Sequence, residues 1–117
     1  MGKESMSLTP AFLKAALIAM ALVLLAPAIA HSAEPLGEQL YKQNDCATCH
    51  AIDHTVVGPS YEAVAKKYAG QKGAVDMLDK AVKDGHVGTW GQVPMPPHPN
   101  LPDATIKTIV EWILTLK

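Results

Sequence analysis

The chain has 117 residues, with ten basic residues that are all lysine, eleven acidic residues and a formal net charge of −1 at pH 7. This balance excludes the basic surface of a nucleic-acid-binding protein, so we expect no nucleic-acid partner. The length corresponds to one small domain. A core of that size is marginally stable unless a metal, a disulfide or a cofactor reinforces it.

Residues 1–33 have the pattern of a secretory signal peptide. Two lysines accompany an apolar run over residues 15–30, and small residues follow it. A basic start, a short apolar run and an A-x-A-like exit are typical of a cleaved leader. The alternative is an uncleaved anchor, but the run is shorter than the roughly 18–20 apolar residues that span a bilayer. We expect cleavage after Ala33, or after Ala30, export to the periplasm without stable membrane insertion, and a mature domain of residues 34–117.

The mature part shows helical periodicity in four segments. Apolar side chains recur at helical spacing in residues 36–44, 60–68, 74–83 and 103–116, and Ser60 is suited to cap the second segment. No stretch alternates with a period of two. The sequence therefore predicts an all-α fold of three to four short helices, without an internal repeat or a second domain.

Residues 84–102 separate the last two predicted helices. These nineteen residues include five prolines and three glycines, which is a high density of helix breakers. We predict that the segment contains no regular structure. A loop of this length inside a compact domain is usually functional.

The segment CATCH, residues 46–50, contains the only two cysteines of the chain and a histidine directly after the second. One interpretation is a zinc site completed by a later histidine, but adjacent Cys49 and His50 would struggle to face one ion. Another is a redox dithiol, whose usual setting is a βαβ pattern that the chain lacks. The third interpretation is the attachment of a c-type haem.

The haem interpretation explains the spacing of these residues. Two thioethers must reach the two vinyl groups along one edge of a porphyrin, and two residues on a helical turn set that span. The next residue, His50, then projects toward the ring centre, where an imidazole nitrogen can ligate iron. The leader and the helical class favour the same group, since haem is attached in the compartment to which the leader directs the chain. We predict one covalently bound haem c, whose burial also supplies apolar contact to a small core.

The second axial ligand of the iron has several candidates in the sequence. Met95 lies between prolines, which fix φ and stiffen its loop, so a weak sulfur ligand there is held in place at little entropic cost. Met77 is interpreted as a core residue on the apolar face of its helix. His98 is a competing candidate, His54 is too close in sequence to the first ligand, and His86 is interpreted as a turn residue.

With CATCH, GP at residues 58–59 and WGQVPMPP at residues 90–97, the chain resembles the short bacterial class I monohaem cytochromes c, the group of cytochromes c-551 and c-552. The resemblance extends over residues 36–117. It implies a crossing of the first and last helices through Leu40, Tyr41 and Trp112. It also implies thioether links at Cys46 and Cys49, axial ligation by His50 and Met95, an imidazole N–H bond to the carbonyl of Pro59, and a haem propionate bond from Trp90.

The resemblance implies a soluble periplasmic electron carrier and no enzyme. Two filled axial positions keep substrates from the iron, which favours outer-sphere electron transfer. The expected partners are redox proteins: a donor such as a quinol-oxidising complex or a multihaem cytochrome, and a terminal oxidase or reductase as acceptor. We expect a monomer, with Lys42, Lys66 and Lys67 as candidates for a ring around the exposed haem edge. The alternatives are a peroxidase-like haem enzyme and a haem-based sensor with a displaceable Met95.

Overall fold

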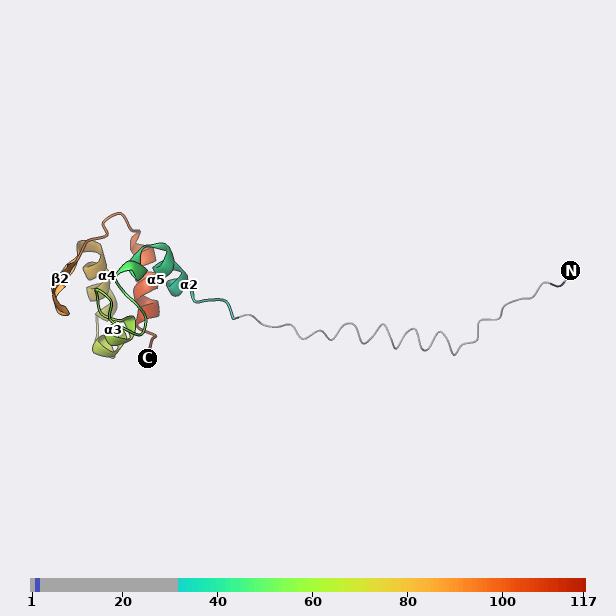
Figure 1. Cartoon of the computed structure of the whole chain (residues 1–117), viewed down its shortest axis with the longest axis horizontal. Coiled ribbons are helices and arrows are strands. Elements are labelled where there is room, and N and C mark those ends of the chain that lie inside the picture. Colours follow the sequence, from blue (N-terminus) through green and yellow to red (C-terminus); the bar gives the residue numbers. More distant parts are fainter. Residues whose placement is uncertain (1, 3–31) are drawn as a thin grey trace. The chain divides into compact units, whose positions relative to one another are not determined.

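The computed structural model describes residue 2 and residues 32–117, and residues 33–117 form one unit. Of the predicted signal peptide, residues 1–33, residues 1 and 3–31 lie outside the described part of the chain. None of the helices in residues 32–117 is long and apolar enough to cross a membrane. The elements in chain order are α2 (Leu36–Gln43), η1 (Cys46–Thr48), α3 (Tyr61–Tyr68), α4 (Ala74–Asp84), β1 (His86–Gly88), β2 (Gly91–Met95) and α5 (Asp103–Ile113) (Figure 1).

The four predicted helices are confirmed, and the fold is predominantly helical. Ser60 caps α3 as expected, because its hydroxyl accepts a hydrogen bond of 3.2 Å from the backbone N–H of Ala63. Among the helix boundaries, the largest difference from the prediction is at the C-terminus, where α5 ends at Ile113 and not at residue 116. There the Thr115 hydroxyl donates to the carbonyl of Trp112 over 2.6 Å, a side-chain contact that competes with continued helix.

The prediction that residues 84–102 hold no regular structure is wrong for the first half of the segment. Strands β1 and β2 form an antiparallel hairpin, in which Gly88 pairs with Gly91 across the turn. Both glycines have positive φ, 102° and 117°, a conformation that L side chains rarely adopt. Pro94 is tolerated in β2 because both strands of a two-stranded sheet are edges. The glycines that argued against a helix therefore make this hairpin possible.

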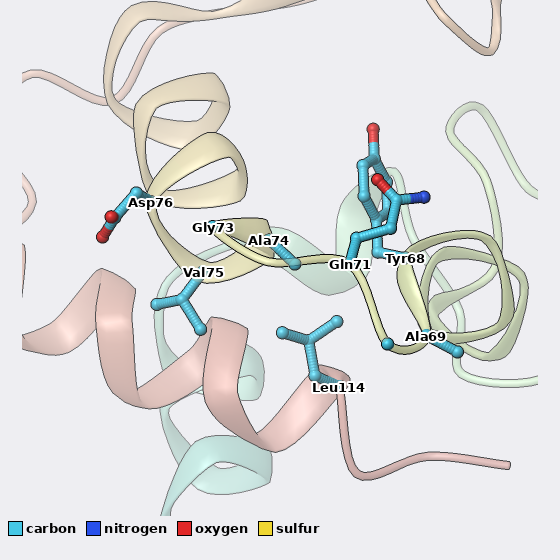
Figure 2. A pocket seen from close by; sticks show the side chains of 9 residues that line it. Tyr68, Ala69, Gln71, Gly73, Ala74, Val75, Asp76 and Leu114 are labelled. Atoms are coloured by element: carbon cyan, nitrogen blue, oxygen red, sulfur yellow. The ribbon is translucent and has the colours of Figure 1, made fainter.

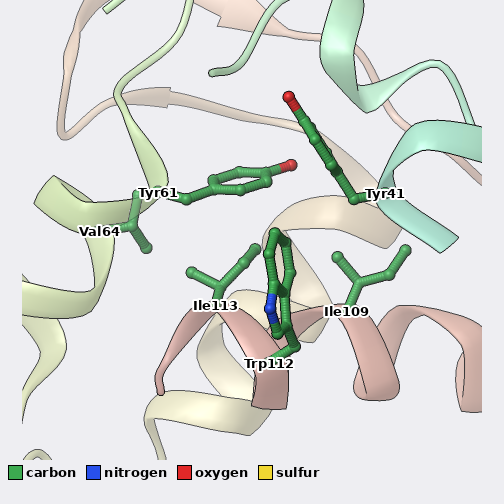
Figure 3. Packing of buried hydrophobic residues seen from close by; sticks show 6 residues of the cluster. All are labelled: Tyr41, Tyr61, Val64, Ile109, Trp112 and Ile113. Atoms are coloured by element: carbon green, nitrogen blue, oxygen red, sulfur yellow. The ribbon is translucent and has the colours of Figure 1, made fainter. Parts of the chain in front are cut away.

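An aromatic cluster lies where α2 and α5 meet (Figure 3). The ring centroids of Tyr41 and Trp112 are 5.8 Å apart, and those of Tyr41 and Tyr61 are 5.1 Å apart. Gly37 allows the two helices to approach closely, since a Cβ at this position would overlap the side chain of Trp112. The predicted crossing of the first and last helices is thus present. The buried cluster comprises Tyr41, Tyr61, Val64, Ile109, Trp112 and Ile113.

Asp79 of α4 is an unfavourable element of the fold. One of its carboxylate oxygens is buried and has no hydrogen-bond partner among the residues that the structure describes. Loss of hydration raises the pKa of Asp79, and the nearby carboxylate of Asp76 adds to this, whereas Lys107 acts in the opposite direction. The ionised form of Asp79 therefore opposes folding.

Asp79→Asn is expected to raise the free energy of unfolding at pH 7 by about 1 kcal/mol, since it removes this charge with little change of shape. Because the folded-state pKa is raised, the cost of ionisation grows as the pH rises above the unfolded pKa, and it is complete once the pH has risen through the pKa in the folded state. The gain should therefore vanish below the unfolded pKa of about 3.9. Denaturant unfolding at pH 7 and at a pH below about 3.9 measures this gain. An equal gain at both pH values would contradict the assignment to charge.

Candidate functional site

The CATCH segment folds as one tight turn. The 3-10 helix η1 begins at Cys46, and the backbone N–H groups of Cys49 and His50 donate to the carbonyl of Cys46 over 3.1 and 2.9 Å. Cys46 is the first residue of this 3-10 turn and Cys49 is its C-cap residue, so a single turn separates the two cysteines. Asp45 enters the turn with φ 60°, a left-handed conformation that aspartate adopts more readily than most residues. Local hydrogen bonds thus fix the backbone between the two cysteines.

The thiol environment does not suit a redox dithiol. Both cysteines are half-buried, and loss of hydration raises the pKa of the Cys46 thiol. A reactive dithiol needs a lowered thiol pKa. The zinc interpretation also lacks support, because residues 32–117 contain no group of three or more His, Cys, Asp or Glu side chains placed to hold a metal ion.

His50 is buried and held by three neighbours. Its Nδ1 lies 2.8 Å from the carbonyl oxygen of Pro59, and since a carbonyl can only accept, Nδ1 carries the proton. Its own carbonyl accepts a 2.7 Å hydrogen bond from the hydroxyl of Tyr41. The ring of Tyr61 stacks on the imidazole, with centroids 5.1 Å apart and planes at 22°. This arrangement leaves Nε2 as the nitrogen with a free lone pair, which is the state a metal-ligating histidine requires.

Gly58 lies directly against the imidazole ring of His50. A Cβ at Gly58 would lie 2.8 Å from Nδ1 of His50 and would overlap the ring at Cε1. The backbone N–H of Gly58 donates to the carbonyl of Cys49 over 2.8 Å, which ties the GP segment to the CATCH turn. Two cysteines one turn apart, followed by an imidazole fixed with Nε2 free, fit a c-type haem.

Met95 is the last residue of β2 and is half-buried. Its carbonyl oxygen faces Gly85, where a Cβ would lie only 2.8 Å away, and Gly85 has φ 82°. Three residues beyond Met95, the backbone N–H of His98 donates to the carbonyl of Val82 over 3.1 Å. The segment that carries Met95 thus lies against the end of α4. His98 Nδ1 is buried and has no hydrogen-bond partner within residues 32–117.

Trp90 lies in the turn of the hairpin and is 41 % exposed. The ammonium group of Lys67 lies 5.5 Å from the centroid of its ring, so a cation–π contact joins the hairpin to α3. Met77, interpreted from the sequence as a core residue, is 46 % exposed, and that interpretation is wrong for the folded polypeptide. Other exposed apolar side chains are Val56, Val57, Val87 and Val93.

The remaining histidines are not gathered at the CATCH turn. His54 is exposed, and its Nδ1 lies 2.7 Å from the Asp53 carboxylate. His86 is also exposed and lies 2.6 Å from the hydroxyl of Thr89. Met95 and His98 are half-buried, whereas His54 and His86 are exposed.

A separate hollow of about 380 Å³ lies between the α3–α4 connection and the end of α5 (Figure 2). Its walls come from residues 68–71 and 73–76 and from Leu114. None of the predicted site residues lines it, so it is not the haem site.

The contacts that Tyr41 and Tyr61 make with His50 were not predicted from the sequence. Tyr61 lies in the segment 60–68, which was predicted only as a helix, and Tyr41 was assigned only to a helix crossing. The position of Tyr61, two residues after Pro59, was the one available signal. Neither contact can be derived from periodicity, because each depends on how separate elements pack.

Comparison with known proteins gives a consistent result. The sequence profile of the family described as cytochrome c matches residues 35–117. Cytochrome c-551 of Azotobacter vinelandii is 53 % identical over 81 residues, which cover 69 % of this chain and 98 % of the relative. Cytochrome c-552 of Hydrogenobacter thermophilus is 52 % identical over 81 residues, covering 69 % of this chain and 82 % of the relative.

The fold comparison agrees with the sequence comparison. The crystal structure of wild-type Nitrosomonas europaea cytochrome c552 superimposes with a TM-score of 0.67 at 45 % identity, covering 68 % of this chain and 99 % of the other. The two cysteines and the histidine of CATCH have the spacing at which a c-type haem is attached. The chain therefore belongs to the cytochrome c family, as a small class I monohaem cytochrome c that carries one covalently bound haem c with iron and transfers electrons.

Proposed function

We propose that the mature chain is a soluble periplasmic carrier, which shuttles single electrons between respiratory redox proteins through a His/Met-ligated haem. The orientation of His50 carries the proposal, because its Nδ1 lies 2.8 Å from the Pro59 carbonyl and its Nε2 is left free for iron. The proposed site comprises Cys46 and Cys49 as thioether links, His50 and Met95 as axial ligands, Pro59 as acceptor for the imidazole N–H, and Trp90 as donor to a propionate.

The bound haem supplies the one-electron chemistry, and the polypeptide holds and shields it. Tyr61 stacks on the imidazole ring of His50 and Gly58 also lies against this ring, so the two residues limit the motion of the ligand. A thioether ligand favours the reduced state and raises the potential. The prolines on both sides of Met95 limit its motion and keep the sulfur from being replaced by water or a substrate.

The expected partners are a donor, such as a quinol-oxidising complex or a multihaem cytochrome, and a terminal oxidase or reductase. Exposed apolar side chains and lysines suit small interfaces that release quickly. Lys66 and Lys67 on α3 are exposed. Lys42, however, forms ion pairs with Glu34, which precedes α2, and with Glu38, which lies in α2. These ion pairs make Lys42 a weaker candidate for partner contacts.

The carrier proposal is tested by the full chain, expressed with its leader in a host that attaches haem. The reduced protein should be oxidised rapidly by ferricyanide, and cyanide at neutral pH should leave this reaction unchanged because the iron has no open position. Hydrogen peroxide should not be consumed catalytically. Prompt cyanide inhibition together with peroxide turnover would contradict the carrier and favour a peroxidase-like enzyme.

Mass spectrometry of the periplasmic product should give a mature chain that begins at Glu34, and an uncleaved chain would contradict the signal peptide.

A further inference from the structure

The last turn of α4 contacts both ends of the segment that carries Met95. At the near end, Gly85 lies against the carbonyl of Met95, where a Cβ would come within 2.8 Å. At the far end, the ammonium group of Lys83 donates to the carbonyl of Leu101 over 2.9 Å. Between them, the backbone bond from His98 to Val82 gives a third contact of 3.1 Å. These contacts bridge up to 18 positions in sequence.

The segment has few backbone N–H groups with which to hold itself in place. Five of the nine residues from 94 to 102 are prolines, which have no N–H group to donate. A cationic donor from a neighbouring helix is therefore an effective way to fix a carbonyl of this segment, and charge-assisted hydrogen bonds are the stronger class.

Lys83 also contacts the start of the next helix. Its ammonium group lies 2.7 Å from the carboxylate of Asp103, the first residue of α5. Asp103 is 88 % exposed, and an exposed ion pair alone contributes little. The side chain of Lys83 is less exposed, at 35 %, and its bond to Leu101 is partly buried. The backbone bond is therefore the contact with the larger expected effect.

We infer that Lys83 and Gly85 are positioning residues for the Met95 sulfur, because they keep its segment closed against α4. The inference rests on the proposed ligation of iron by Met95. Local opening of a segment is governed by the few contacts that hold it, and it can occur while the rest of the domain stays folded. Loss of the Lys83 contact should therefore free Met95 more often without unfolding the helices.

The chain provides a matched control for Lys83. Lys80 lies one turn earlier on the same helix, and its ammonium group pairs with Asp84 over 2.7 Å. That contact stays within α4 and does not involve the Met95 segment. Lys80→Met and Lys83→Met therefore remove the same charge from the same helix, and only the second removes a bond to the segment.

The experiment measures how fast cyanide binds to the ferric iron of the haem-loaded full chain, since binding requires that Met95 leave. Lys83→Met should bind cyanide about tenfold faster than wild type, as expected for loss of one charge-assisted hydrogen bond. Lys80→Met should match wild type. Lys83→Arg keeps a cationic donor and should bind cyanide more slowly than Lys83→Met. Gly85→Ala should also bind cyanide faster than wild type.

Three results would overturn the inference, and they are distinguishable. Equal cyanide rates in Lys83→Met and Lys80→Met, in a wild type that shows the sulfur-to-iron absorption band, would overturn the positioning role alone. A wild type without that band would overturn the proposed ligation and the positioning role together. A lower unfolding temperature of Lys83→Met without a faster cyanide rate would indicate a purely structural lysine, and it would also contradict the inference.

Discussion

Replacing Met95 by alanine is expected to open the sixth position of the iron and to lower the reduction potential by roughly 0.1–0.3 V, a fraction of the ~0.8 V that axial ligands control. The change removes the thioether that favours the reduced state. Cyanide should then bind the ferric protein at once. Spectroelectrochemistry and ligand binding on the haem-loaded protein measure both effects.

Met77→Ala is the matched control for this substitution. Met77 is 46 % exposed on α4 and should leave both the potential and the cyanide reaction unchanged. His98→Ala tests the other candidate ligand, because the Nδ1 of His98 is buried without a partner among the described residues. Immediate cyanide binding by ferric His98→Ala, with Met95→Ala unaffected, would transfer the ligand assignment to His98.

The double variant Cys46→Ala, Cys49→Ala is expected to lose covalent haem completely. Without thioether bonds, any haem that binds should be extracted by acidified organic solvent, and a haem-stained denaturing gel should show no band. The domain should also be far less stable, because a core of this size is marginal without its cofactor.

Each single cysteine variant should retain at most one thioether and reduced staining. Thr48→Ala changes the same turn but neither sulfur, so it should stain like wild type. A haem-stained band of normal intensity in the double variant would contradict the assignment of these cysteines.

The helices could be predicted from the sequence because apolar spacing depends on local geometry. The core-facing residues Ile109, Val110 and Ile113 of α5 follow that period, and all are buried. The hairpin could not be predicted by the same reasoning. Glycine and proline exclude helix, but only the pairing of β1 with β2 distinguishes a glycine that ends structure from one that shapes a turn.

The site was predictable in part. The CATCH turn is a local motif, and the structure shows the local hydrogen bonds expected of it. The environment of His50 is not local, because Tyr41 comes from α2 and Tyr61 from α3. Both tyrosines also belong to the buried aromatic cluster. The crossing of α2 and α5 therefore supports the histidine as well as the core, a connection that no sequence period reveals.

Exposure was the least predictable property. Met77 has the spacing of a core residue, yet it lies largely outside the polypeptide core. Apolar periodicity identifies the face of a helix, but it does not show whether that face is covered by protein. The contact between Lys83 and Leu101 could not be predicted either, because the two residues are 18 positions apart in the sequence and meet only in the folded chain.

The most direct test of the account is the absorption spectrum of the ferric haem-loaded protein. Ligation by His50 and Met95 predicts a weak long-wavelength band from sulfur-to-iron charge transfer. This band should persist at neutral pH in wild type and in Met77→Ala, and it should be absent from Met95→Ala. A wild-type spectrum without the band, or a band that survives in Met95→Ala, would contradict the His/Met-ligated carrier.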